Sequence, residues 1–440
     1  MLETPIPPLV ISLAIPTVIS MLVTSIYNMA DTYFVSQINT SASGAVGIVF
    51  SIMAAIQAFG FMVGMGAGSI SARLLGQNKG DEASVYSSSA VLTALILGVF
   101  FAGLGLLFLE PLIWLLGSTE TIFPYAIEYA RYILLGAPVM VLAYTLNNLL
   151  RWQGLAYLSV IGLAIGGIIN MILDPIFIFV FDLGIGGAGA ATLLSQCISL
   201  LILISFFVLG KSELRVARSC ISRSPQVYLS IFKQGMPSFF RQAVFSFGIS
   251  SLNFNAKPFG DAAVAAMSIV SRVFMVASSI VIGFGQGFQP VLGYNYGAGK
   301  NDRVKQTILY SLKVCTGILL AAALLGYLFA PQIITVFRRD DAQVIAIGTQ
   351  ALRFQALTLP LGAVLTFANM LFQSLGKSWR ATILAVCRQG LFIPLVFFLR
   401  WHFGLTGLQV AQPVADLLAF LIAAPIMLHY FLREFDQPPE

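Results

Sequence analysis

The stretch Leu158–Phe181, LSVIGLAIGGIINMILDPIFIFVF, is mainly apolar and is interrupted by Asn170 and Asp174. Because a bilayer span needs ~20 mainly apolar residues, we predict that this stretch crosses a membrane as a helix. The two polar residues are four positions apart, so they share one face of that helix. Pro175 removes a backbone donor and clashes with the carbonyl of Met171, which predicts a bend beside the acid. A helix kink is also expected at Pro16, in the first apolar stretch. A carboxylate at this depth costs about 2.5–3.5 kcal/mol on insertion scales and therefore indicates a wet cavity or a polar partner.

The composition places the whole chain in a membrane. It is 58% hydrophobic and 10% charged, and its mean hydropathy is +0.89. Soluble domains have ~25% charged residues, so we predict a polytopic, all-α membrane protein. The net charge of +6 comes from short loops between apolar segments, which favours membrane orientation over nucleic-acid binding. The four cysteines are scattered and there are two histidines, so we expect no disulfide framework, no metal–thiolate site and no cofactor.

Twelve apolar segments follow one another along the chain, and we predict one transmembrane helix for each. They are 9–36, 44–72, 86–110, 122–150, 157–181, 187–210, 229–256, 262–292, 305–330, 342–373, 379–402 and 406–431. A longer polar interruption, 211–228, lies near the midpoint of the 440 residues. We therefore expect a six-helix lobe over 1–210, a linker over 211–228 and a second six-helix lobe over 229–440.

The two halves resemble each other at a nearly constant offset in the numbering. The offset is 221 between Pro16 and Pro237, and it is 222 between Asn147 and Asn369. The loop sequences GQNKGD (76–81) and GAGKND (297–302) keep Gly, Lys and Asp at the first of these offsets. Because this loop match is polar, it is stronger evidence for duplication than the likeness of apolar segments. The sequence thus predicts an internal repeat.

Six spans in each half bring both halves into the membrane from the same side. The repeats are then parallel, and we expect a substrate cleft between the two lobes. Loops after even-numbered spans hold Arg73, Lys79, Arg151, Lys211, Arg215, Arg218, Arg223, Lys300, Arg303, Lys377 and Arg380. The opposite loops hold Lys257, Arg338, Arg339 and Arg400. The excess of positive charge predicts that the first set, and with it both termini, is cytoplasmic.

Polar residues inside the apolar spans of the first half form the candidate site. They are Asp31 in span 1, Asn147 and Asn148 in span 4, Asn170 and Asp174 in span 5, and Thr192 in span 6. Carboxylate, amide and hydroxyl oxygens suit a proton relay or a hard cation such as Na⁺. We expect Asp31 and Asp174 to converge, with Asn170 beside them. The alternative is that Asp31 caps or ends span 1 near the outer surface and that Asp174 merely hydrogen-bonds within the lobe. Asn147, Asn148 and Thr192 would then bond across helices as packing groups.

The second half does not repeat these acids. Leu252 corresponds to Asp31, and the position matching Asp174 falls near Ile393-Pro394. Arg241, Arg272, Arg388 and Asp416 lie in apolar spans of this half instead. We expect Arg388 and Asp416 to pair between spans 11 and 12, and Arg241 and Arg272 to extend to an interface.

With these features the chain resembles the multidrug and toxic-compound extrusion (MATE) family over nearly its whole length. The resemblance rests on twelve spans in two parallel halves, Pro16, the loops LLGQNKGD and YNYGAGKND, Asp31 and the Asn170–Pro175 segment. It implies two six-helix bundles forming a V and, as in the bacterial branches with first-lobe coupling acids, a cation-coupling site at Asp31, Asn147, Asn170, Asp174 and Thr192. Na⁺ is one coupling ion that Asp31, Asn170 and Asp174 would hold. Acids that other branches have in spans 7 and 10 are missing here.

The implied function is secondary-active export of organic cations or other drugs from the inner membrane against H⁺ or Na⁺, by a monomer. One alternative is a lipid-linked saccharide flippase, which would require Arg241, Arg272 and Arg388 to point into the central cleft. A second alternative, an integral membrane transferase, would need a nucleophile–base pair or a carboxylate–metal cluster, and the sequence offers neither. A Walker-type phosphate loop is also missing, which disfavours ATP-driven pumping.

Overall fold

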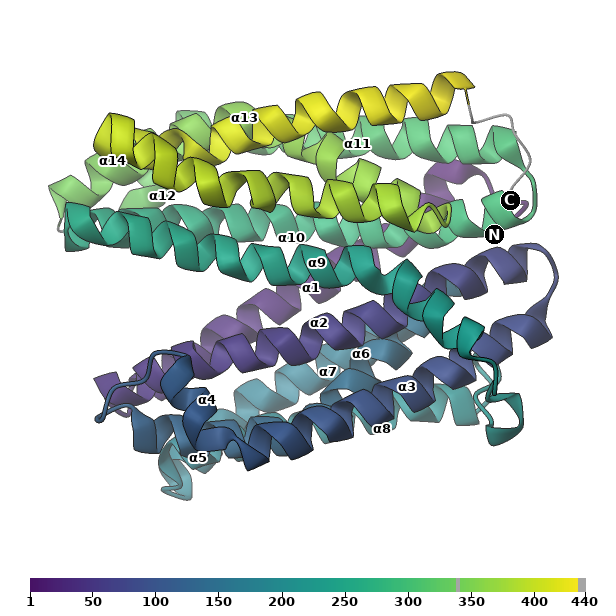
Figure 1. Ribbon diagram of the computed structural model, residues 1–440, viewed down its shortest axis with the longest axis horizontal. Helices are drawn as coiled ribbons and strands as arrows, with labels where there is room; N and C mark the ends of the chain where they lie inside the picture. Colours follow the sequence, from purple (N-terminus) through teal and green to yellow (C-terminus); the bar gives the residue numbers. More distant parts are fainter. Residues whose placement is uncertain (338–340, 434–440) are drawn as a thin grey trace.

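The computed structural model describes residues 1–337 and 341–433. Arg338 and Arg339, which enter the loop-charge argument, lie outside the described residues. Every regular element of the described ranges is a helix, which confirms the all-α prediction (Figure 1). The helices of the second half form one layer and those of the first half form another, and α1 passes between the two layers.

The helices of the first half are α1 (Ile6–Ser36), α2 (Thr40–Gly76), α3 (Gly80–Leu107), α4 (Leu109–Leu115), α5 (Phe123–Leu135), α6 (Ala137–Trp152), α7 (Ala156–Pro175), the π-helical η1 (Ile176–Val180) and α8 (Gly184–Val208). The connection to the second half contains the short 3₁₀ helix η2 (Arg218–Cys220). The second half comprises α9 (Pro225–Ala256), the 3₁₀ helix η3 (Lys257–Phe259), α10 (Asp261–Gly297), α11 (Asn301–Leu328), α12 (Ala330–Phe337), α13 (Ala342–Ser374) and α14 (Ser378–Arg433).

The number of spans differs from the predicted twelve when length and apolarity are the test. Nine described helices pass it, and the pair α5 and α6, bent by 50°, makes a tenth. α14 counts once although it has 56 residues, and it is interrupted at Gly404 with φ 57° and ψ −132°. Its two arms run side by side from this turn, so it covers both predicted spans 379–402 and 406–431 (Figure 1). α9 is long enough at 32 residues but is not one of the nine.

The repeat is visible in the backbone as well as in the sequence. Gly154 and Gly376, which match at an offset of 222, both end a helix with positive φ, at 86° and 84°. Gly184 and Gly404, which match at an offset of 220, adopt φ of 55° and 57° at corresponding turns. L-residues rarely adopt this conformation, and glycine does so without a Cβ penalty. The same turn geometry at nearly constant offsets supports the predicted duplication.

The two halves exchange contacts through their first helices. α1 packs against α7 of its own half and against α10 of the other, while α9 packs against α14 and α2. Val10 and Ala14 of α1 belong to the hydrophobic core of the second half, and Ile231 of α9 belongs to the core of the first. These crossings lie toward the N-terminus of the chain and the positively charged loops around Lys79 and Lys300, an end that we call the basic end.

Repeat-related glycines allow this close approach. Gly66 of α2 and Gly287 of α10 match at an offset of 221. A Cβ on Gly66 would meet the carbonyl of Ile231 in α9, and a Cβ on Gly287 would meet the backbone of Ala14 in α1. Hydrogen bonds also join the halves, among them Thr17 Oγ1 to Gly283 O (2.6 Å), Ser25 Oγ with Ser279 Oγ (3.2 Å), Arg73 Nη1 to Ser374 O (2.9 Å) and Arg151 Nη1 to Gln286 Oε1 (2.6 Å).

We expect Gly287→Ala to lower the apparent melting temperature of the purified protein. The added methyl group would press on the Ala14 backbone, and overpacking of this kind costs about 1–3 kcal/mol. Gly317→Ala in α11 is the matched control, because a Cβ there meets no described atom within 4 Å. At that position the better helix propensity of alanine should raise stability by up to ~1 kcal/mol. Equal shifts in the two variants would contradict the close-contact interpretation.

Candidate cation-coupling site in the first half

Two buried carboxylates from different helices lie in the first half. Asp31 of α1 is 7% exposed and Asp174 of α7 is 0% exposed. The two helices that hold them, α1 and α7, pack against each other. Two charged carboxylates in a low-dielectric environment are costly unless a cation accompanies them. The pair therefore suits the uptake of a single positive charge.

Asn170 connects Asp174 to α8. Its Nδ2 donates to Asp174 Oδ1 at 3.0 Å and to Thr192 Oγ1 at 3.3 Å. The first of these bonds follows from the spacing of four residues on one helical face. Thr192 also lies beside Tyr129 of α5, whose hydroxyl donates to Asp31 Oδ2 at 3.2 Å. Polar side chains thus run continuously from one acid to the other.

Several oxygen atoms of this cluster have no hydrogen-bond partner among the described residues. They are Tyr27 OH, Asp31 Oδ1, Asn170 Oδ1 and Asp174 Oδ2. Buried polar atoms are normally satisfied, so each unpaired oxygen calls for an explanation. A proton or a hard cation held by these oxygens would supply one, because such cations prefer carboxylate, amide and hydroxyl ligands. The site fits the coupling ion that the sequence predicts, H⁺ or Na⁺.

The side-chain hydrogen bond of Asn147 goes to a residue outside this cluster. Its Nδ2 donates to Ser159 O of α7 at 2.7 Å. Asn369 of the second half makes the equivalent bond to Ala381 O at 2.6 Å, over the same separation of 12 residues. Because both halves share this bond and the second half lacks the acids, it fastens one helix to the next. The alternative interpretation of Asn147, as a packing residue, is the one that this geometry favours.

The helix that contains Asp174 is irregular directly after the acid. α7 ends at Pro175, and five residues of π-helix, Ile176–Val180, follow. A proline cannot donate its backbone nitrogen to the ladder, and π-turns are a common cause of local bending. Pro16, by contrast, lies inside the continuous helix α1. The irregularity expected beside the acid thus takes the form of a π-helical turn.

Two tyrosines belong to the cluster and were missed by reasoning from the sequence. Tyr27 precedes Asp31 by one helical turn and is buried, and its spacing was the signal that could have revealed it. Tyr129 comes from α5, so no local pattern connects it with Asp31. Arg151, which the sequence places in a loop, is 2% exposed and donates to Gln286 of α10.

The arginines of the second half have different partners. Arg388 Nε donates to Asp416 Oδ1 at 2.7 Å and its Nη2 donates to Asp416 Oδ2 at 3.2 Å. This ion pair joins the two arms of α14, and Asp416 is fully buried. Arg241 Nη1 donates to Asn369 Oδ1 at 2.9 Å, which is an amide and carries no charge.

The described ranges contain no group of cysteine or histidine side chains that could form a metal site. Within them, no three His, Cys, Asp or Glu side chains are grouped so that they could hold a metal ion. All four cysteines are free thiols. A cation at Asp31 and Asp174 would depend on amide and hydroxyl oxygens for its remaining ligands.

Comparisons with known proteins agree with this architecture. The MatE family model matches residues 16–176 and again 237–398. "Multidrug export protein MepA" of Staphylococcus saprophyticus is 26% identical over 424 residues, covering 96% of this chain and 93% of that protein. A solved "outward-facing conformation of a multidrug resistance MATE family transporter" has a TM-score of 0.90 at 27% identity, covering 97% and 96% of the two chains. A Pyrococcus furiosus transporter of the MOP superfamily, described with "reverse polarity of binding pocket", has a TM-score of 0.87 at 28% identity and covers 96% and 95%.

Proposed function

Since the chain belongs to the MatE family, we propose that it is a secondary-active multidrug exporter driven by H⁺ or Na⁺. Relatives named as multidrug export proteins support the export of drugs or organic cations. The observation that supports the coupling most strongly is the buried pair Asp31 and Asp174 with unpaired oxygens around it. Its members come from α1 and α7, two helices that pack against each other. As a member of a transporter family the chain is not an enzyme, which removes the membrane transferase from consideration.

The proposed coupling step takes place at the acid pair. Binding of one proton or one Na⁺ relieves the repulsion between the carboxylates and pairs the orphan oxygens. Asn170 transmits the change, because its amide bonds Asp174 and Thr192 together. The π-helical turn after Pro175 gives α7 a place to bend in response. Since α1 also packs against α10 of the other half, a shift at Asp31 reaches the contact between the halves.

We place the protein in the inner membrane as a monomer with both termini cytoplasmic. The positively charged loops gather at the basic end, where α1 begins. An excess of Lys and Arg in short loops marks the cytoplasmic side. In this orientation the glycine-mediated contacts between α1 and α10 and between α2 and α9 close the cytoplasmic face.

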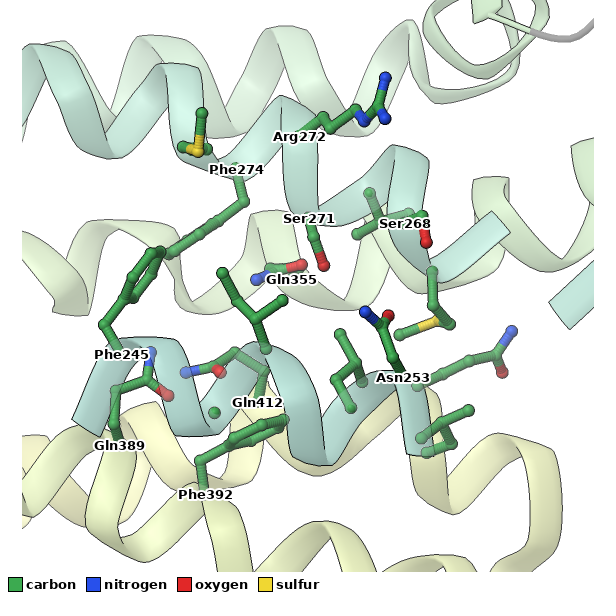
Figure 2. A pocket seen from close by; sticks show the side chains of 18 residues that line it. Phe245, Asn253, Ser268, Ser271, Arg272, Phe274, Gln355, Gln389, Phe392 and Gln412 are labelled. Atoms are coloured by element: carbon green, nitrogen blue, oxygen red, sulfur yellow. The ribbon is translucent and has the colours of Figure 1, made fainter. Parts of the chain in front are cut away.

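A lipid-linked saccharide flippase is the weaker candidate. It requires several free cationic groups for a pyrophosphate, but the charge of Arg388 is paired with Asp416. Figure 2 shows a cavity of the second half that is lined by residues of α9, α10, α13 and α14. The guanidinium of Arg272 is directed away from this cavity. Arg241 and Arg388 both line a smaller cavity of the second half, where Arg388 has Asp416 as its counter-charge and Arg241 donates to the neutral amide of Asn369. This arrangement supports the exporter over the flippase.

Transport by proteoliposomes with an imposed gradient tests the proposal. Purified full-length protein is reconstituted, and ethidium movement is followed first under a pH gradient and then under a Na⁺ gradient. We expect one of the two gradients to drive ethidium against its own concentration gradient, since the coupling site takes one cation. Empty liposomes and a gradient-collapsing ionophore are the controls. Ethidium movement that is the same with and without each of the two gradients would refute coupled export.

A further inference from the structure

A cavity of about 260 Å³ lies inside the second half. It is lined by residues of α9, α10, α13 and α14, with aromatic walls from Phe245, Phe274 and Phe392 (Figure 2). A neighbouring cavity of about 170 Å³ shares Phe245, Met275 and Gln389 with it. The larger space is slightly below the ~300–1,000 Å³ of pockets for drug-sized ligands, so it suits a small molecule.

The cavity occupies the position that corresponds, through the repeat, to the acid site of the first half. Leu252 and Phe392 line it, and they match Asp31 and Asn170 at offsets of 221 and 222. The position matching Asp174 is Val396 at the offset of 222 and Pro394 at the offset of 220 that holds for Gly184 and Gly404, and both residues are apolar. The repeat has therefore kept the place and replaced its carboxylates and amide by apolar side chains.

A second exchange of residues accompanies the cavity of the second half. Tyr27 packs against Gly167 there, with 3.6 Å between the tyrosine Cβ and the position that a Cβ of Gly167 would take. The matching residues of the second half are Gly248 and Gln389, so the large and the small residue have changed places. A Cβ on Gly248 would lie 2.7 Å from Gln389 Oε1. In the second half a glutamine side chain thus lies where the tyrosine side chain of the first half begins, and Gly248 and Gln389 both line the cavity.

The polar groups of the cavity are amides and hydroxyls. Gln389 is 9% exposed, and its Oε1 has no hydrogen-bond partner among the described residues. The side chains of Ser271, Gln355 and Gln412 surround the same space, whereas Arg272 points away from it (Figure 2). Such groups offer both donors and acceptors without charge.

Electrostatics argues against a cation in this place. Of the described residues that line the two cavities, none is Asp or Glu. Arg241 and Arg388 line the smaller one, and Asp416 pairs with the second of these arginines. A cation that entered the larger cavity would lose its hydration, and no described carboxylate in the wall would compensate its charge. This loss is costly at membrane depth.

We propose that the cavity lined by Gly248 and Gln389 binds a small uncharged aromatic molecule that carries hydrogen-bond donors and acceptors. The phenylalanine walls hold its ring, and the amide of Gln389 donates or accepts toward its polar substituents. The two halves then have separate tasks. The first half keeps a charged site for the coupling ion, and the second half has turned the equivalent place into a neutral binding site.

The test uses 7-amino-4-methylcoumarin, which is uncharged, aromatic and equipped with an amine and a carbonyl. Its binding to the full chain in lipid nanodiscs is measured by equilibrium dialysis, with empty nanodiscs as the correction for partition into lipid. We expect saturable binding at about one molecule per chain. Gly248→Phe should weaken the affinity at least tenfold by filling the space, whereas Gly317→Phe in α11, where a Cβ meets no described atom, should leave it unchanged. The cation 6-methoxy-N-ethylquinolinium, of similar size, should bind at least tenfold more weakly than the coumarin.

Folding of the variants is followed by thermal melting in the same nanodiscs. If Gly248→Phe does not fold, the nearly isosteric Gln389→Leu and Gln355→Leu decide, and each should weaken coumarin binding several-fold. The proposal is overturned if the wild-type chain shows no saturable binding or if the folded variants bind as the wild type does. Equal affinity for the quinolinium and the coumarin would overturn it too.

Discussion

Asp174→Asn is expected to reduce drug export to the background of cells that lack the protein. Asparagine keeps the size of the side chain and its bond to Asn170 but cannot be ionised, so the site can no longer take up and release a cation. Asp174 is fully buried in α7, which packs against α1, the helix that holds Asp31. The measurement is ethidium efflux from preloaded cells at matched expression, which should fall at least tenfold.

Asp261→Asn is the matched control for this variant. Asp261 begins α10 and is exposed, so the same chemical change should leave efflux within about twofold of the wild type. An intact melting transition for Asp174→Asn is required to separate lost coupling from lost folding. Normal efflux by the folded variant would rule out Asp174 as a coupling group.

The second large effect is expected on stability, from Arg388→Met. Asp416 is 0% exposed and accepts hydrogen bonds from Arg388 at 2.7 and 3.2 Å and from Gln412 at 2.9 Å. Removal of the arginine would leave a buried carboxylate without its cation, which destabilises proteins by about 3–5 kcal/mol. Thermal melting of purified protein in detergent should show a large downward shift.

The double variant Arg388→Met/Asp416→Leu provides the control for this effect. Replacing both members of a buried ion pair by apolar groups of similar volume is often neutral or stabilising. We therefore expect the double variant to melt nearer to the wild type than the single variant does. If the double variant melts lower than Arg388→Met, the unpaired charge is not the cause.

The structural features that could be predicted from the sequence are those that depend on residues close together in the chain. Asn170 and Asp174 are one turn apart in the same helix, so their bond followed from spacing alone. The all-helical fold followed from apolar segment length. The two arms of α14 follow the predicted spans 379–402 and 406–431, because Gly404, in the predicted break, adopts the non-helical backbone that a tight turn needs.

Features that depend on packing between distant segments were beyond the sequence. Arg151 lies next to a predicted loop, and its burial arises only because α10 of the other half covers it. Tyr129 reaches Asp31 from a helix far along the chain. Tyr27 and Gly167 are replaced by Gly248 and Gln389 in the second half. That the large and the small residue have changed places is recognised only from the contact within each pair.

Coupling of drug export to a cation taken up at Asp31 and Asp174 is tested by measuring both flows at once. Ethidium flux and the opposing H⁺ or Na⁺ flux are recorded in the same proteoliposomes, for the wild type and for Asp31→Asn/Asp174→Asn. We expect ethidium movement in the wild type to be matched by an opposite flow of one of these ions, and both flows to stop in the double variant. Ethidium export without a counter-flow, or coupled flow that persists in the double variant, would show that these acids are not the coupling site.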